Sequence, residues 1–309
     1  MQKKVGNVVI DDTWYPGEDL YTDGEIEDRM LCLAQQYGDI DYSEVIAREK
    51  SWPILYHFSH IRENILSWLP IGKEDEVLEI GSGCGAVTGA LAAKAAQVDC
   101  IELSMKRTMI NASRHRNASN VRILVGNFQD IEPRLGKKYD WITLIGVFEY
   151  SEAYIQSEKP YQDMLRRISS HLKPGGKIIV AIENRLGLKY WAGCTEDHVG
   201  SYFEGLEGYP HTSGVKTFSR SELEQVISEA GSFTSKFYYP YPDYKMPMAI
   251  YSDDYLPNAG ELNNVKYNFD RERIRLFDEA RVADTILQNH LFPEFSNSFL
   301  VWIEREEEE

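Results

Sequence analysis

The feature that most constrains the fold is a regular alternation of short apolar segments with segments of helical spacing between residues 76 and 182. Each apolar segment has the length of one strand, and the segments between them are long enough for a crossover. Strands joined in this way lie parallel in a sheet whose two faces are covered by helices. The strands expected in this region are 76–80, 98–103, 121–125, 139–145 and 177–182.

Two later segments extend this sheet. Further strands are expected at 233–239 and 298–304, which makes seven in a doubly wound, Rossmann-like α/β sheet. Two long excursions interrupt the regular pattern, at about 184–217 and 240–296. Because long excursions in a compact α/β chain are usually functional, we expect both to be lid-like insertions.

The two ends of the chain differ from this core in composition. Residues 1–70 form an acidic N-terminal segment followed by a cap helix, whose apolar side chains recur at helical spacing from Trp52 until Pro70 ends it. The core then spans 71–304, and 305–309 form a charged tail.

Helical spacing and cap residues predict further helices after the cap. The clearest starts at Ser219, which has Glu222 three residues later as a capping box, and stops at Gly231. The expected helices are 85–96, 105–116, 161–172, 219–230 and 271–288.

A glycine-rich turn follows the first strand of the alternating region. Gly81, Gly83 and Gly85 let the backbone approach a ligand closely, and the helix after them offers unpaired N–H groups. Gly81, Gly83 and Ala86 also fit the pattern of a dinucleotide site, so the turn alone does not decide between ligand classes. Glu102 ends the second strand, where an acid can bond the ribose hydroxyls in either class.

Motifs further along the chain separate the two classes. Glu79 lies inside the end of the first strand, Asn127 and Phe128 follow the third strand, and Lys173-Pro-Gly-Gly176 leads into the fifth. Together with the glycine-rich turn, this ordered set from Glu76 to Glu183 resembles the class I S-adenosylmethionine-dependent methyltransferases. Asn127 departs from the family pattern, because many relatives carry Asp there.

The resemblance implies a fold detail, a cofactor and a set of binding residues. The last strand of the sheet would run antiparallel, and the cofactor would be S-adenosylmethionine. Asn127 and Phe128 would hold the adenine, while Tyr56 and Arg62 of the cap would reach the methionine carboxylate. The cofactor-binding residues expected in this way are Glu79, Gly81, Ser82, Gly83, Gly85, Glu102, Leu103, Asn127, Phe128, Gly146, Tyr56 and Arg62.

Methyl transfer needs an acceptor atom aligned with the methyl group, and a hydroxyl acceptor also profits from a general base. Glu149 follows the fourth strand at the carboxyl edge of the sheet, where ligands of open α/β folds bind. His198, with Asp197 beside it, is the most base-like residue of the first insertion. We therefore expect His198 and Glu149 to be catalytic, and the alternative for His198 is an ordinary surface position.

Aromatic residues indicate the class of acceptor. Tyrosines cluster in both insertions, and the first also holds Trp191; the flat apolar faces and polar atoms of such rings suit sugar rings, although these rings also pack against sheets. The segments 183–193, 207–210 and 297–301 resemble bacterial methyltransferase domains, several of which occur beside glycosyltransferase modules in surface-polysaccharide systems. We expect a saccharide or another small polar acceptor, with a glycosyltransferase as partner or fused module.

Charge and hydropathy argue against other classes of protein. The chain carries 33 Lys and Arg against 49 Asp and Glu, a net charge of −16, which disfavours nucleic acid and anionic membranes as partners. No apolar run is long enough to span a membrane and no signal peptide is recognisable, so we expect a soluble, cytoplasmic protein. The four cysteines form no CxxC pair, and no metal site is expected.

Two other functions stay open. A non-catalytic module of a larger glycan-assembly protein could bind the cofactor or a glycan, and the Glu-rich end of the sequence is typical of a piece cut from a longer chain. An NAD(P)-dependent oxidoreductase is the other alternative, because the glycine-rich turn and Glu102 also suit a dinucleotide.

Overall fold

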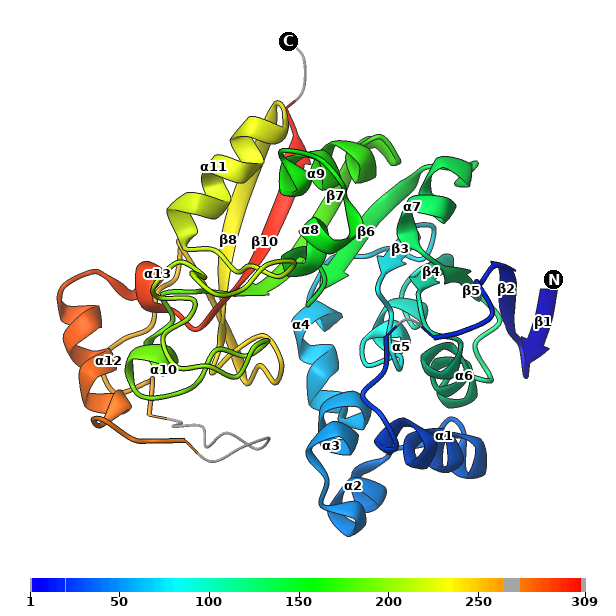
Figure 1. The fold of residues 1–309 in the computed structure, drawn as a ribbon, viewed down its shortest axis with the longest axis horizontal. Helices are drawn as coiled ribbons and strands as arrows, with labels where there is room; N and C mark the ends of the chain where they lie inside the picture. Colours follow the sequence, from blue (N-terminus) through cyan, green and yellow to red (C-terminus); the bar gives the residue numbers. More distant parts are fainter. Residues whose placement is uncertain (1, 20, 264–272, 307–309) are drawn as a thin grey trace. The chain divides into compact units, whose positions relative to one another are not determined.

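The computed structural model describes residues 2–19, 21–263 and 273–306, and Figure 1 shows their path. Residues 307–309 of the expected tail and 271–272 of the expected last helix lie outside the described residues. The chain divides into two compact units. The first contains Met1–Leu144 and Ile168–Lys177, and the second contains Ile145–Arg167 and Ile178–Glu309.

The fold is α/β with a mixed sheet, and the expected count of seven strands is wrong, because the sheet has ten. All seven expected strands are present. The three additional strands are β1 (Gln2–Val5), β2 (Val8–Trp14) and β9 (Ala249–Ser252). The sequence pattern hides β2 because Asp11 and Asp12 interrupt its apolar residues; the Asp11 carboxylate is buried and accepts hydrogen bonds from the Thr13 N–H and hydroxyl.

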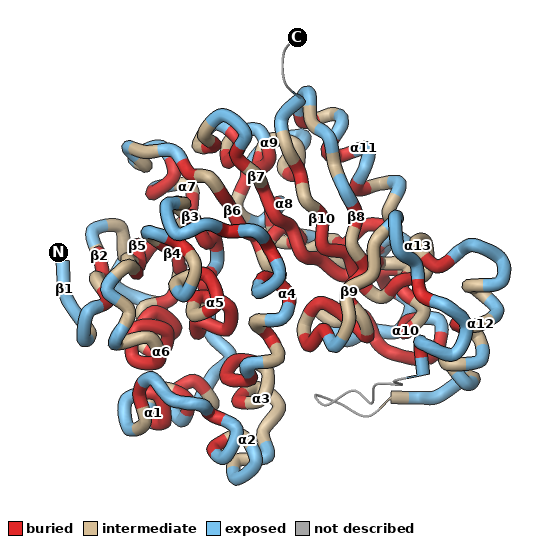
Figure 2. The backbone as a smooth tube through the Cα atoms, turned by 180° about the vertical axis from the view of Figure 1, so that it is seen from behind, coloured by how far each residue is buried: buried red, intermediate tan, exposed pale blue. Residues whose placement is uncertain are grey.

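In the first unit the strands follow the order β1-β2-β5-β4-β3-β6. β1 is antiparallel to β2, and all the other neighbours in this series are parallel. Every residue of β3 and β4 except the first of each strand is buried, and Figure 2 colours the buried residues red. The bounds of the remaining strands are Glu76–Ile80 for β3, Gln97–Glu102 for β4, Val121–Gly126 for β5 and Tyr139–Ile145 for β6.

The cap segment is not one continuous helix. It consists of α3 (Trp52–Phe58), the 3₁₀ turn η1 (His60–Glu63) and α4 (Asn64–Ser67). The helix stops at Ser59, whose backbone is extended and whose hydroxyl accepts the Ile61 N–H. The other helices of this unit are α1 (Ile26–Tyr37), α2 (Ser43–Glu49), α5 (Thr88–Ala92), α6 (Met105–Arg114), α7 (Phe128–Ile131) and the 3₁₀ turn η2 (Glu132–Arg134).

The N-terminal helices share a hydrophobic core with the glycine-rich turn. Met30 and Leu33 of α1 and Phe58 of α3 pack in one buried cluster with Cys84 of the turn and Ile110 of α6. The first seventy residues are therefore packed into the same unit as the strands that precede and follow the turn.

The second unit holds most of β7 (Leu172–Glu183), followed in strand order by β10 (Ser298–Arg305), β8 (Phe233–Tyr241) and β9. The closing strand β10 is antiparallel to β8, and β9 is antiparallel to β8 as well. The Lys173–Gly176 motif, which the sequence places before the fifth strand, forms the start of β7, with a positive φ at Gly175.

Helix α11 (Arg220–Ala230) confirms the expected capping box, because the Ser219 hydroxyl accepts the Glu222 N–H and the Glu222 carboxylate accepts the Ser219 N–H. The expected helix at 271–288 is α12, which begins only at Glu279, after the Asp278 side chain caps it. Further helices are η3 (Phe148–Tyr150), α8 (Ser151–Tyr154), α9 (Pro160–Ser169), α10 (Leu188–Trp191), α12 (Glu279–Gln288) and α13 (Phe292–Phe295). Among the described residues, no helix has the length and apolarity needed to cross a bilayer.

Candidate functional site

The turn after β3 contains three glycines, of which Gly83 and Gly85 have different surroundings. Gly81, Gly83 and Gly85 all have positive φ, of 70°, 52° and 76°. A Cβ on Gly85 would lie 2.4 Å from Oδ1 of Asn111, whereas a Cβ on Gly83 would meet no atom within 4 Å. The backbone at Gly83 therefore borders open space, as a turn that receives a ligand requires.

Glu102, at the end of β4, is bound directly to this turn. Its Oε2 accepts the Gly83 N–H at 2.7 Å, and its Oε1 accepts the Ser104 N–H at 2.9 Å. The side chain is buried, and burial raises the pKa of Glu102 while the backbone donors oppose that shift. Ser82 is buried beside Gly83 and Leu103 is half-buried next to Glu102, so these expected cofactor residues are gathered at adjoining strand ends.

Glu79 is engaged inside the unit. Its Oε2 accepts the Thr88 hydroxyl at 2.7 Å, and the Cys100 thiol lies 3.3 Å from the same oxygen. Burial raises the pKa of Glu79 to about 7. The side chain thus joins β3 to α5 and β4 beneath the turn.

The last turn of α6 fixes the carbonyl groups of the glycine-rich turn. Nη1 of the buried Arg114 donates to the carbonyls of Cys84, at 2.7 Å, and His57, at 2.8 Å. Nε2 of His115 lies 3.0 Å from the Gly85 carbonyl, and burial lowers the pKa of His115 to about 4, so the neutral ring donates this bond. Sequence reasoning missed both residues, because a basic pair at the end of a helix usually faces solvent.

The N-terminal segment adds a buried ion-pair network to the start of α6. Nε of Arg107 pairs with Oε1 of Glu27 at 2.7 Å, and the same guanidinium also binds Asp23. Glu27 is fully buried, and His57 lies 3.6 Å from the Asp23 carboxylate. This network holds the N-terminal helices against the element that follows Glu102.

The two expected cap residues lie together. The Arg62 guanidinium stands 4.3 Å from the centre of the Tyr56 ring, and Arg62 is 3% exposed. Tyr56 also stacks on Trp52. The structure therefore brings Tyr56 and Arg62 into one aromatic–cation group on α3 and η1.

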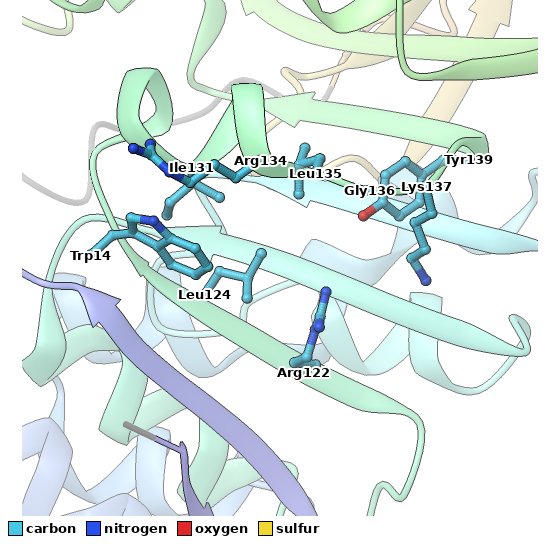
Figure 3. Close-up of a pocket in the computed structure, with 9 residues that line it drawn as sticks. All are labelled: Trp14, Arg122, Leu124, Ile131, Arg134, Leu135, Gly136, Lys137 and Tyr139. Atoms are coloured by element: carbon cyan, nitrogen blue, oxygen red, sulfur yellow. The ribbon is translucent and has the colours of Figure 1, made fainter.

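Asn127 and Phe128 follow β5, as expected. Oδ1 of Asn127 accepts the Gln129 N–H at 3.0 Å and so caps α7, while Phe128 is buried. Figure 3 shows a nearby pocket of about 140 Å³, between Trp14, Arg122 and Leu124 on one side and the segment 131–139 on the other. None of the residues lining this pocket is an expected cofactor residue.

In the second unit, the two expected catalytic residues are brought together. Glu149, on η3, is fully buried, and its Oε1 lies 3.4 Å from Nε2 of His198. Glu183, at the end of β7, is also fully buried, and its Oε2 lies 3.8 Å from the same nitrogen. Sequence reasoning missed Glu183 as a member of this group, although the end of a parallel strand is where ligand-binding side chains gather.

The partner of His198 is Glu196 rather than its neighbour Asp197. Nδ1 of His198 lies 2.9 Å from Oε1 of Glu196, whose Oε2 accepts the N–H groups of His198 and Val199. Asp197 instead binds Lys189 at 2.7 Å and also binds Lys245. Lys245 extends this charged group to Glu183, whose Oε1 is 2.8 Å away.

Burial and neighbouring charges shift the pKa values of this cluster. Burial raises the pKa of Glu149, His198 opposes this shift, and the nearby Glu183 carboxylate adds to it. Burial lowers the pKa of His198, but Glu183, Glu149 and Glu196 outweigh it and raise that pKa well above its usual value.

Gly146, which precedes η3, has a φ of 70°, and a Cβ there would lie 2.8 Å from the Tyr244 hydroxyl.

Known proteins resemble part of this chain. Residues 78–178 match the model of a methyltransferase domain, and this match supports S-adenosylmethionine as the cofactor. A probable cobalt-precorrin-6B C(15)-methyltransferase (decarboxylating) of Methanothermobacter thermautotrophicus is 34% identical over 113 residues, which cover 35% of this chain and 53% of that protein. A ribosomal RNA small subunit methyltransferase A of Syntrophus aciditrophicus is 27% identical over 101 residues, 33% of each chain.

The chain thus spans about half the length of one of these curated relatives and a third of the other. Among solved structures, the CcbJ methyltransferase from Streptomyces caelestis has 18% identity and a TM-score of 0.49, with 89% of this chain and 99% of that chain covered.

Proposed function

We propose that this chain is an S-adenosylmethionine-dependent methyltransferase that methylates a hydroxyl group of a saccharide or another small polar acceptor. The observation that carries the proposal is the hydrogen bond from the Gly83 N–H to the Glu102 carboxylate, at the point where the glycine-rich turn borders open space. An acid at this strand end is suited to bond ribose hydroxyls, and the match of residues 78–178 to a methyltransferase domain supports the same cofactor.

The remaining expected residues complete the proposed cofactor site. Gly81, Ser82, Gly83 and Gly85 would supply a close backbone surface, and Leu103 would border the nucleoside. The other proposed cofactor residues are Glu79, Asn127, Phe128, Gly146, Tyr56 and Arg62. Asn127 carries an amide nitrogen that can donate, and its oxygen already caps α7, so it offers the adenine different bonds from those of a carboxylate.

Calorimetry with S-adenosylhomocysteine tests the cofactor site. Wild-type protein should bind one equivalent, and Glu102→Ala should lower the affinity at least about tenfold, because a bond to a charged group contributes roughly 1.5–3 kcal/mol. Glu74→Gln removes an exposed carboxylate from the same unit and should bind like wild type. Absence of binding by the wild-type protein would refute the proposal.

On the acceptor side we propose His198 and Glu149, which lie 3.4 Å apart in the second unit. A buried carboxylate beside a half-buried imidazole suits recognition of an acceptor that carries hydroxyl groups. Much of the rate of a methyl transfer comes from alignment and exclusion of water, so these residues need not supply all of the acceleration.

Transfer of labelled methyl from S-adenosylmethionine to candidate glycans separates the proposed enzyme from a binding module, which would hold the cofactor without turnover. An oxidoreductase would instead enhance the fluorescence of NADPH. Labelled product with no NADPH response is the outcome we expect.

A further inference from the structure

Three side chains of the second unit converge although they come from separate segments. Glu149 lies on η3, Glu183 ends β7 and His198 lies in the loop after α10. One ligand atom of each falls within 4.8 Å of the others. The imidazole Nε2 is 3.4 Å from the Glu149 oxygen and 3.8 Å from the Glu183 oxygen, close to the spacing of about 3.4 Å between two ligands bonded at about 2.1 Å to a tetrahedral ion.

Among the described residues, the nearest cationic group to the buried Glu149 carboxylate is the His198 imidazole, 3.4 Å away and without hydrogen-bond geometry. The Glu149 side chain is 0% exposed, and neither oxygen accepts a hydrogen bond from any residue that the structure describes. A buried ionised group without a donor is costly, and buried charges in proteins are paired or coordinate metals. This carboxylate is directed at Nε2 of His198 and therefore into the centre of the three-residue group.

His198 is oriented as a metal ligand is. Its Nδ1 faces Glu196, which is itself fixed by the Val199 N–H and the Tyr209 hydroxyl. Histidines that bind metals almost always give their other ring nitrogen to a carboxylate or carbonyl, which fixes the ring and its tautomer. The carboxylate of Glu196 thus leaves Nε2 directed at the two glutamates.

The carboxylates around His198 outnumber the cations that face them, which are the imidazole itself and one lysine. Three carboxylates, of Glu149, Glu183 and Glu196, surround the ring, and Lys245 is the single lysine paired with any of them among the described residues. Lys245 is also shared with Asp197. A divalent cation would supply the missing positive charge.

We propose that Glu149, Glu183 and His198 bind one divalent transition-metal ion of the zinc type. Two carboxylates and one imidazole suit borderline ions such as Zn²⁺ better than Mg²⁺, which prefers oxygen ligands alone. Three protein ligands leave a coordination position open for an oxygen of another molecule. This site stands on the geometry of the second unit and does not depend on methyl transfer.

Binding of Zn²⁺ tests the site directly. The full chain is prepared with Cys32→Ser, which removes the exposed thiol, and is stripped of metal with a chelator. Calorimetry should then show one equivalent of Zn²⁺, and Co²⁺ should give the visible absorption of a tetrahedral site. Glu149→Gln and His198→Gln should each lower the Zn²⁺ affinity by at least about 100-fold.

Glu204→Gln is the matched control. Glu204 is another buried acid of this unit, but its carboxylate is satisfied by the His211 N–H and the Thr212 hydroxyl, so this variant should keep the full equivalent. Thermal unfolding of each apo-variant verifies folding, and Glu183→Gln replaces any ligand variant that fails this check. Zn²⁺ should raise the melting temperature of the wild-type protein and not that of the ligand variants.

Wild-type protein that takes up no Zn²⁺ would overturn the proposal, and so would ligand variants that bind Zn²⁺ as tightly as wild type. Calorimetry with S-adenosylhomocysteine on the same samples keeps the two proposals distinguishable, because the cofactor site belongs to other residues.

Discussion

Glu79 is buried and His115 is half-buried near the glycine-rich turn, and their pKa values are displaced in opposite directions. Burial raises the pKa of Glu79 from 4.5 to about 7 and lowers that of His115 from 6.5 to about 4. The contribution of Glu79 to stability is therefore complete below about pH 4.5 and is lost as the pH rises to 7. That of His115 is complete above about pH 6.5 and is lost as the pH falls to 4, so the two slopes oppose each other.

Single substitutions should separate the contributions of Glu79 and His115 to the pH dependence of the free energy of unfolding. Relative to wild type, Glu79→Gln should gain about 3 kcal/mol in free energy of unfolding as the pH rises from 4.5 to 7, because each pKa unit corresponds to about 1.4 kcal/mol. His115→Gln should gain a similar amount relative to wild type as the pH falls from 6.5 to 4. Urea unfolding across this range measures both, with Glu74→Gln as the exposed control. A stability difference independent of pH would contradict the argument.

The glycines of the turn should respond differently to alanine. Gly85→Ala should cost more than about 2 kcal/mol, because the positive φ is strained and the new Cβ would lie 2.4 Å from the Asn111 side chain. Gly83→Ala should cost only about 1 kcal/mol, since its Cβ meets open space. If that space receives the cofactor, Gly83→Ala should nevertheless bind S-adenosylhomocysteine less tightly. Denaturation and calorimetry on both variants check the order, and equal stability losses would count against it.

Among the helices, α6 stabilises the glycine-rich turn through the hydrogen bonds of Arg114. Arg114→Met would leave the carbonyls of Cys84 and His57 buried without their donor, and we expect a loss of about 2–4 kcal/mol in the free energy of unfolding. Arg281→Met, on the exposed side of α12, should change stability by less than about 0.5 kcal/mol. Thermal unfolding compares the two variants. Equal melting temperatures would show that Arg114 does not support the turn.

The sequence predicts those elements whose apolar residues are buried on both sides. β3 through β7 are found where the apolar runs lie, and α11 starts where its capping box lies. Helix 85–96 shrinks to α5, since the positive φ of Gly85 delays its start. The N-terminal strands escape prediction because Asp11 is buried through hydrogen bonds that no periodicity reveals.

In the site, too, residues at strand ends could be predicted from the sequence, whereas contacts made by the folding of loops could not. The positions of Gly83 and Glu102 at one edge of the sheet could be predicted, because each follows or ends an apolar run and the carboxyl ends of parallel strands lie at the same edge. The pairing of His198 with Glu196 could not, because it depends on how Glu196 folds the loop back onto its own N–H groups. Glu183 could not be assigned to the cluster either, because His198 reaches it only through the path of the loop that follows α10.

Within the first unit as a whole, the N-terminal residues are part of the fold, because β2 pairs with β5 and Glu27 pairs with Arg107. A chain beginning at Lys73 would lack β2 and α1 and would leave Arg107 without Glu27 and Asp23, so we expect it to lose cooperative unfolding. A chain beginning at Val8 would lack only the exposed edge strand β1 and should still melt cooperatively. Circular dichroism on heating distinguishes the two. A cooperative transition in the shorter chain would contradict this view.

The parallel pairing of β2 with β5 also has a consequence for how the molecule is made. Val9 pairs with Arg122, so β2 waits for its parallel neighbour until residues 121–126 have left the ribosome. Pairings over such long stretches of sequence slow folding, because the loop must close before the contact rewards it. A chaperone would therefore meet β2 unpaired during this interval.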